Sequence, residues 1–138
     1  MKEISLRKRI LYYVGLSVIN LIVALLAIML AITCVGVHEG EIIFASLALA
    51  FLISHYVFGL IFLKTKRIFK LIVPFVTSIV SFGCACLIAE ITIDIIYSDI
   101  LLAFVLLFPI IFVWEIAYQI LKRCLNKKSS SQNQMSEL

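Results

Sequence analysis

Charged residues are scarce in this chain, and long stretches of it have none. Only 14% of its 138 residues are Asp, Glu, Lys or Arg, whereas 64% are hydrophobic. Soluble domains carry about 25% charged and about 45–50% apolar residues. This composition excludes an ordinary water-soluble domain. The apolar excess has to be solvated by lipid, so we expect an all-α integral membrane protein.

Residues suited to metal, disulfide or catalytic chemistry are few and poorly spaced. The chain has four Cys and two His, without a His-Glu-x-x-His motif or a Cys/His quartet. Cys84 and Cys86 would point to nearly opposite sides of a helix. No nucleophile–base pair or phosphate-binding loop is visible. We therefore expect no metal site, no cofactor and no enzyme activity.

Proline is also rare, with two residues in the whole chain. Pro74 lies in the first turns of a long apolar run and costs little there, whereas Pro109 lies mid-run and predicts a kink. Each apolar run is long enough to cross a bilayer as a helix. The predicted spans cover residues 10–35, 42–63, 71–89 and 100–121.

The basic residues all lie on one side of this four-span pattern. The twelve Lys and Arg precede the first run, separate the second from the third, and follow the fourth. The other two connections carry only acids. Short loops rich in Lys and Arg stay in the cytoplasm during insertion. The pattern predicts two helical hairpins in the cell inner (cytoplasmic) membrane, with both termini cytoplasmic.

The basic residues form short patches beside spans, which attract anionic headgroups, so we expect the lipid bilayer and no nucleic acid as a partner. Residues 1–125 are predicted to form one transmembrane domain. Residues 126–138 are rich in Ser, Gln and Asn and are predicted to be a disordered cytoplasmic tail.

The two halves of the chain are similar in layout. Lys8-Arg9-Ile10 matches Lys66-Arg67-Ile68, and Glu41-Ile42 matches Asp99-Ile100 without gaps. A parallel internal repeat is one interpretation. The other is that any evenly spaced four-span protein has this layout.

Small residues recur at helical spacing in the first three runs, as in the Ser46-Ala50-Ser54 face. Helices in lipid associate through such close contacts. We expect the first three spans to pack closely. The bulky fourth span should be the most lipid-exposed, or should face a partner.

Three polar residues inside the runs are candidate binding residues, because polar groups in a bilayer are costly. Asn20, His55 and Glu115 fall at comparable heights in the cytoplasmic half of the bilayer, so one pocket could join them. Glu115 would hold a proton or a cation, and His55 would titrate near neutral pH. The alternatives are structural: interhelical hydrogen bonds for Asn20 and His55, and pairing of Glu115 along its own helix.

An acidic rim is predicted on the outer side of the membrane. It would attract cations before binding or transport; alternatively, these acids are ordinary solvated loop residues. The predicted rim consists of Glu39, Glu41, Glu90, Asp94 and Asp99.

The layout is similar to that of the GtrA-like family of small four-span proteins, which is associated with lipid-linked sugar movement. The similarity rests on the basic start, on Gly15 early in the first run, and on the basic restart at Lys66-Arg67. That family tends to place an Asn-Phe pair and further basic and aromatic residues where spans two and four exit. Here those places read His55-Tyr56 and Trp114-Glu115, so no residue role is carried over.

We expect a small transporter or flippase-type subunit that acts as a homo-oligomer or in a larger membrane complex, because four helices enclose little volume. The alternative is a non-transporting accessory, regulatory or immunity-type protein that packs against a partner membrane protein.

Overall fold

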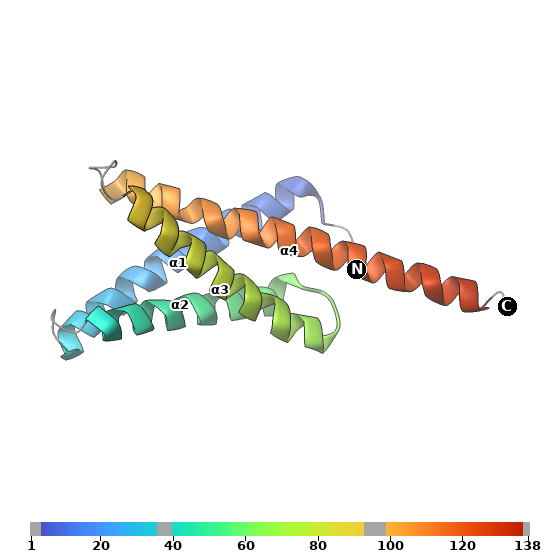
Figure 1. The fold of residues 1–138 in the computed structure, drawn as a ribbon, viewed down its shortest axis with the longest axis horizontal. Helices are drawn as coiled ribbons and strands as arrows, with labels where there is room; N and C mark the ends of the chain where they lie inside the picture. Colours follow the sequence, from blue (N-terminus) through green and yellow to red (C-terminus); the bar gives the residue numbers. More distant parts are fainter. Residues whose placement is uncertain (1–3, 36–39, 93–98, 137–138) are drawn as a thin grey trace.

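The computed structural model describes residues 4–35, 40–92 and 99–136, with side chains left undescribed at 35, 99–104, 106 and 127–136. These residues form helices and no strands. The helices are α1 (Leu6–Val35), α2 (Gly40–Phe62), α3 (Arg67–Thr92) and α4 (Asp99–Ser136), shown in Figure 1.

Three of the helices are long and apolar enough to cross a membrane: α1 over Leu6–Cys34, α2 and α3. The prediction of an all-helical membrane protein is therefore confirmed for three spans. Within the described residues, α4 is not among these candidates.

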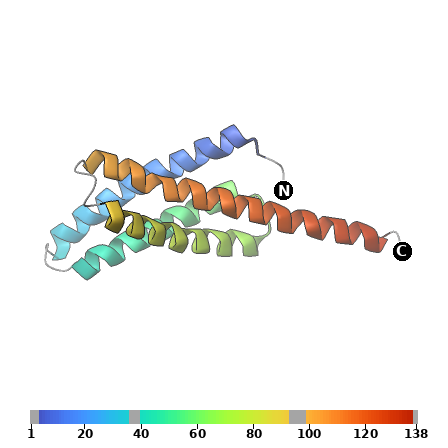
Figure 2. The same ribbon diagram turned by 45° about the horizontal axis from the view of Figure 1, so that its top comes forward.

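The helices pack in a ring. Each helix contacts its neighbours in the chain, and α4 closes the ring by contacting α1. The start of α1 and the α2–α3 connection lie at one end, which we call the basic end (Figures 1 and 2). At the opposite, acidic end, α1 and α2 diverge from α3 and α4. The described cations of the basic end are Arg7, Lys8, Arg9, Lys64, Lys66, Arg67, Lys70, Lys122 and Arg123.

The core is an aromatic cluster near the basic end. Tyr13, Trp114 and Tyr118 are at most 1% exposed, and Phe62 packs against all three rings. Two of these large residues come from α4, so one face of the fourth span belongs to the core. That this span is the most lipid-exposed, or faces a partner, stays a prediction. Its apolar residues are not equivalent, because one stripe is buried while Phe112, on another face, is 68% exposed.

The α2–α3 contact is especially close at Gly59. A Cβ atom added there would overlap the ring of Pro74, so glycine lets the two backbones approach. The proline ring fills the space that a larger residue at position 59 would occupy. This contact is the kind of small-residue packing expected between helices in lipid.

The C-terminal part of α4 continues past the bundle to Ser136 (Figure 1). Beyond Asn126 the structure describes only the backbone, as a helix that ends at Ser136, and the predicted disorder of this tail stays a prediction. No Pro or Gly follows Pro109 before Ser136, so no residue breaks the helix once the buried part of α4 has started it.

Candidate functional site

An ion pair joins the first helix to the last. Arg9 Nε donates to Glu115 Oε2 at 3.1 Å, and Arg9 Nη2 donates to Glu115 Oε1 at 2.9 Å. Such a two-pronged arginine–carboxylate pair has strong and directional hydrogen bonds. Only 8% of the Arg9 side chain and 29% of the Glu115 side chain are exposed. The pair therefore fixes the contact between α1 and α4 near the basic end.

Other groups hold this ion pair in place. Arg9 Nη1 donates to the Ile4 carbonyl at 2.7 Å, and the guanidinium lies 4.5 Å from the ring centre of Tyr118. Gln119 Nε2 donates to Glu115 Oε1 at 2.6 Å. The carboxylate thus accepts hydrogen bonds from both Arg9 and Gln119. Its charge is compensated and its position is set from both helices.

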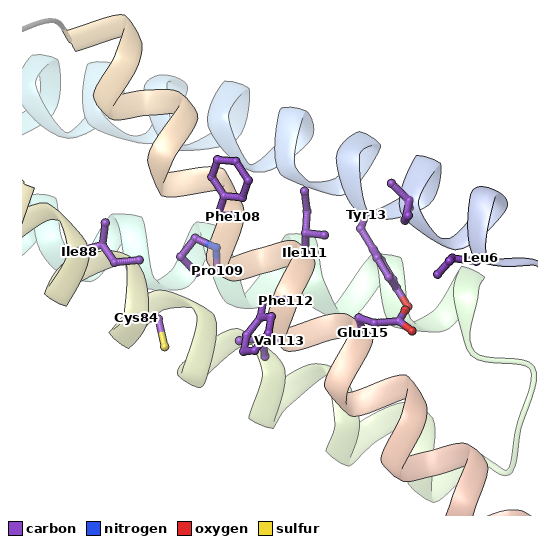
Figure 3. A pocket seen from close by; sticks show the side chains of 11 residues that line it. Leu6, Tyr13, Cys84, Ile88, Phe108, Pro109, Ile111, Phe112, Val113 and Glu115 are labelled. Carbon is purple, nitrogen blue, oxygen red and sulfur yellow. The ribbon is translucent and has the colours of Figure 1, made fainter. Parts of the chain in front are cut away.

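Glu115 also lines a groove between α1, α3 and α4 with a volume of about 540 Å³ (Figure 3). The Tyr13 hydroxyl points toward the Glu115 carboxylate at the same end of the groove. Beyond these two groups the lining is apolar. The groove itself exposes only apolar surface, because Tyr13 is fully buried and the Glu115 carboxylate is bonded to Arg9 and Gln119. The remaining lining residues are Leu6, Ile10, Cys84, Ile88, Phe108, Pro109, Ile111, Phe112 and Val113.

Asn20 connects α1 to α2. Its Oδ1 accepts a hydrogen bond of 2.6 Å from Ser54 Oγ, and its Nδ2 donates to the Leu16 carbonyl at 3.1 Å. Asn20 also borders a separate cavity of about 290 Å³, which residues of all four helices line. The rest of that lining is apolar and lies toward the acidic end. In this structure Asn20 is above all an interhelical hydrogen-bonding residue.

His55 is fully buried on α2. Its Nδ1 lies 2.9 Å from the Phe51 carbonyl; a carbonyl only accepts, so Nδ1 carries the proton. The imidazole stacks on Trp114 with ring centres 6.0 Å apart. Among the described residues, five buried polar atoms have no hydrogen-bond partner: Tyr13 Oη, His55 Nε2, Thr65 Oγ1, Ser81 Oγ and Trp114 Nε1.

The three predicted binding residues therefore have different surroundings. Asn20 lines the 290 Å³ cavity, Glu115 lines the 540 Å³ groove, and His55 lines neither. His55 nevertheless contacts Trp114, the residue before Glu115. The sequence reasoning missed the role of Arg9. One signal was present: Glu115 is the only Asp, Glu, Lys or Arg within the four predicted spans, and a buried carboxylate is costly unless it is paired.

The predicted acidic rim is described only in part. Glu41 and Glu90 are exposed, at the start of α2 and near the end of α3. Asp99 begins α4, and its side chain is not described; Glu39 and Asp94 lie outside the described residues. The rim remains a prediction. Over the described ranges, no three His, Cys, Asp or Glu residues are grouped as a metal site would require.

No family model, no curated protein and no solved structure matches the chain. The similarity to the GtrA-like family therefore rests on layout alone.

Proposed function

We propose that the chain crosses the cytoplasmic membrane four times, with both termini in the cytoplasm. α1, α2 and α3 supply three crossings. The apolar run at 100–121 supplies the fourth, because Glu115 is its only charged residue and Arg9 compensates that charge. The basic end is then the cytoplasmic end, as the Lys and Arg bias requires.

We propose that the protein is a small transporter or flippase-type subunit that holds an amphipathic molecule in the α1–α3–α4 groove. The shape of the groove carries this proposal: about 540 Å³ of mostly apolar wall ends at Glu115 and Tyr13. Ligand sites are typically apolar clefts with a few placed polar groups. A lipid-like molecule would place its chain along the wall and its head at the basic end.

The ion pair suggests how the site works. Arg9 and Glu115 connect α1 to α4 beside the groove, so the pair holds these two helices together at the basic end while the molecule lies against them. The groove is open along its side, so a second copy or a partner subunit would be needed to enclose the molecule during its passage.

The test is lipid movement in vesicles that contain the full chain. Ile10→Trp fills the groove from α1, and Ile22→Trp is the matched control; both isoleucines are exposed on α1, and only Ile10 lines the groove. Transbilayer movement of a fluorescent short-chain phospholipid is followed by dithionite quenching. We expect Ile10→Trp to slow movement several-fold and Ile22→Trp to leave it unchanged. Movement no faster than in protein-free vesicles would overturn the proposal.

The second candidate is a non-transporting accessory, regulatory or immunity-type protein. The helical extension of α4 to Ser136 favours it, because the backbone of this segment continues as a helix beyond the bundle, where a cytoplasmic partner can reach it. Deleting residues 127–138 distinguishes between the two candidate functions. A transporter keeps its lipid movement after this deletion, whereas an accessory protein loses co-purification of its partner membrane protein.

A further inference from the structure

The second cavity of the bundle lies apart from the groove, in the acidic half. It has a volume of about 290 Å³, and residues of all four helices line it. Among them are Leu21 of α1, Leu47 of α2, Ala85 of α3 and Leu107 of α4. This is the half in which α1 and α2 diverge from α3 and α4 (Figure 2), so the cavity lies between two helix pairs.

The lining of this cavity offers almost nothing to a polar molecule. Apart from the Cys86 thiol, Asn20 is its only polar side chain. Asn20 is 2% exposed, its Oδ1 accepts a hydrogen bond from Ser54, and its Nδ2 donates to the Leu16 carbonyl. A buried water needs about two to four polar partners, which this lining does not provide. The cavity is therefore suited to an apolar occupant.

The cavity can be reached from the side of the bundle. Leu25 is 54% exposed and Cys86 is exposed, and both belong to the lining. A helix of a partner protein is too wide to enter, because with its side chains it measures about 10–12 Å across. Around a membrane-spanning helix the narrow apolar groups are the hydrocarbon chains of the lipids.

We propose that this cavity binds a hydrocarbon chain of a membrane lipid, inserted from the side between the two helix pairs. An apolar cavity of about 150 Å³ in a soluble protein binds benzene, so this larger one has room for a stretch of acyl chain. The chain supplies contacts that the small lining residues Ala24, Ala85 and Ala89 leave unmade. The site is separate from the groove, and the inference does not depend on lipid movement.

The experiment uses the full chain in vesicles that contain a phosphatidylcholine with a diazirine near the end of one acyl chain. Irradiation attaches this chain to the residues that it contacts, and mass spectrometry of the peptides locates the attachment. We expect attachment at Leu21, Leu47 and Leu107 in the cavity, and also at Phe112 on the exposed face of α4. Attachment confined to exposed faces such as that of Phe112 would overturn the proposal.

A cavity-filling variant locates the chain more sharply. Ala24→Phe fills the cavity, and Ala27→Phe is the matched control, because Ala27 is also half-buried on α1 but does not line the cavity. Ala24→Phe should lower attachment at Leu107 several-fold and leave attachment at Phe112 unchanged, whereas Ala27→Phe should change neither. If Ala24→Phe loses helix content, the smaller change Ala89→Leu on α3 replaces it. Undiminished attachment at Leu107 in a folded cavity-filling variant would overturn the proposal.

The groove and the cavity give distinguishable results. Ile10→Trp should leave attachment at Leu47 and Leu107 unchanged, whatever its effect on lipid movement. A parallel loss of attachment at both residues would show that groove and cavity are one site, and would overturn the separate cavity. Efficient disulfide formation between Cys86 of two copies, with no attachment at Leu107, would assign the cavity to a second copy and overturn the choice of a lipid chain.

Discussion

The two halves of the bundle differ in what they bury. Toward the basic end, the buried residues include Trp114, Tyr13 and Tyr118. Toward the acidic end, the described residues that are buried are mostly small, among them Ala31, Ala50 and Ala85, and Ile110 beside the cavity is the large exception. The 290 Å³ cavity lies in that half, where α1 and α2 diverge from α3 and α4 (Figure 2).

This difference indicates which half of the bundle is rigid and which half can change conformation. Large side chains, the Arg9–Glu115 pair and the Gly59–Pro74 contact fix the basic half. Small side chains around a cavity leave few contacts to break in the acidic half. We therefore expect conformational change to be concentrated toward the acidic end.

The largest effect on the free energy of unfolding is expected from replacing a phenylalanine by alanine, tested separately in each half of the bundle. Phe62→Ala removes a ring that is 4% exposed in the aromatic cluster and should lower the free energy of unfolding by about 3–5 kcal/mol. Phe82→Ala removes a half-buried ring beside the cavity and should cost roughly half as much, because less contact is lost. Unfolding by steric trapping in bicelles measures both. Equal losses of unfolding free energy in the two variants would contradict the claim that the basic half is more tightly packed.

Substitutions that break the Arg9–Glu115 ion pair should have the next largest effect on the free energy of unfolding. Arg9→Ala leaves the Glu115 carboxylate without its main partner, and we expect a loss of about 3 kcal/mol in the free energy of unfolding. Glu115→Gln should cost less, because the amide still accepts hydrogen bonds. In a double-mutant cycle the two losses should be clearly less than additive. Additive losses would show that the two side chains do not depend on each other.

Two glycine substitutions test the close α2–α3 contact. Gly59→Ala forces a Cβ atom into the Pro74 ring and should cost about 1–3 kcal/mol in unfolding free energy through overpacking. Gly83→Ala on α3 meets no atom within 4 Å and should be neutral or stabilising by up to about 1 kcal/mol. Thermal unfolding in detergent distinguishes them. A stabilising Gly59→Ala would contradict the contact.

The smallest difference in stability is expected between two variants in which a buried serine is replaced by alanine. Ser54 donates to Asn20 at 2.6 Å, so Ser54→Ala should cost about 0.6 kcal/mol, the average for hydrogen bonds between membrane helices. Ser81 Oγ is buried without a partner among the described residues, so Ser81→Ala should be neutral or slightly stabilising. Chemical denaturation of the two variants in the same detergent measures the difference. A clear loss of stability in Ser81→Ala would show that its hydroxyl is hydrogen-bonded in the membrane.

The sequence predicted the helices well because lipid imposes a simple rule. A long run without charges has to be helical. The observed helices begin within four residues of the predicted starts and end within three residues of the predicted ends, except α4, which continues fifteen residues beyond 121. Small residues were expected at close helix contacts, and Gly59 makes such a contact with Pro74. The structural alternative given for Asn20, an interhelical hydrogen bond, is formed with Ser54.

Which face of α4 is buried could not be predicted. Trp114 and Phe112 have similar hydrophobicity, yet the first is 0% and the second 68% exposed. In lipid, hydrophobicity does not distinguish a buried face from an exposed one, so the pattern that identifies a core in a soluble helix is missing. The Arg9–Glu115 pair was missed for a related reason: it depends on α1 and α4 being neighbours, which is a tertiary fact.

The central claim is that the basic end faces the cytoplasm after four crossings, and cysteine labelling tests it most directly. In a variant without Cys34, Cys84 and Cys86, native Cys124 marks the basic end, and Gly40→Cys, in open space at the start of α2, marks the acidic end. An impermeant maleimide is applied to intact protoplasts and to permeabilised ones. The account predicts labelling at position 40 in intact protoplasts and at Cys124 only after permeabilisation. Labelling of Cys124 in intact protoplasts, with position 40 protected, would contradict it.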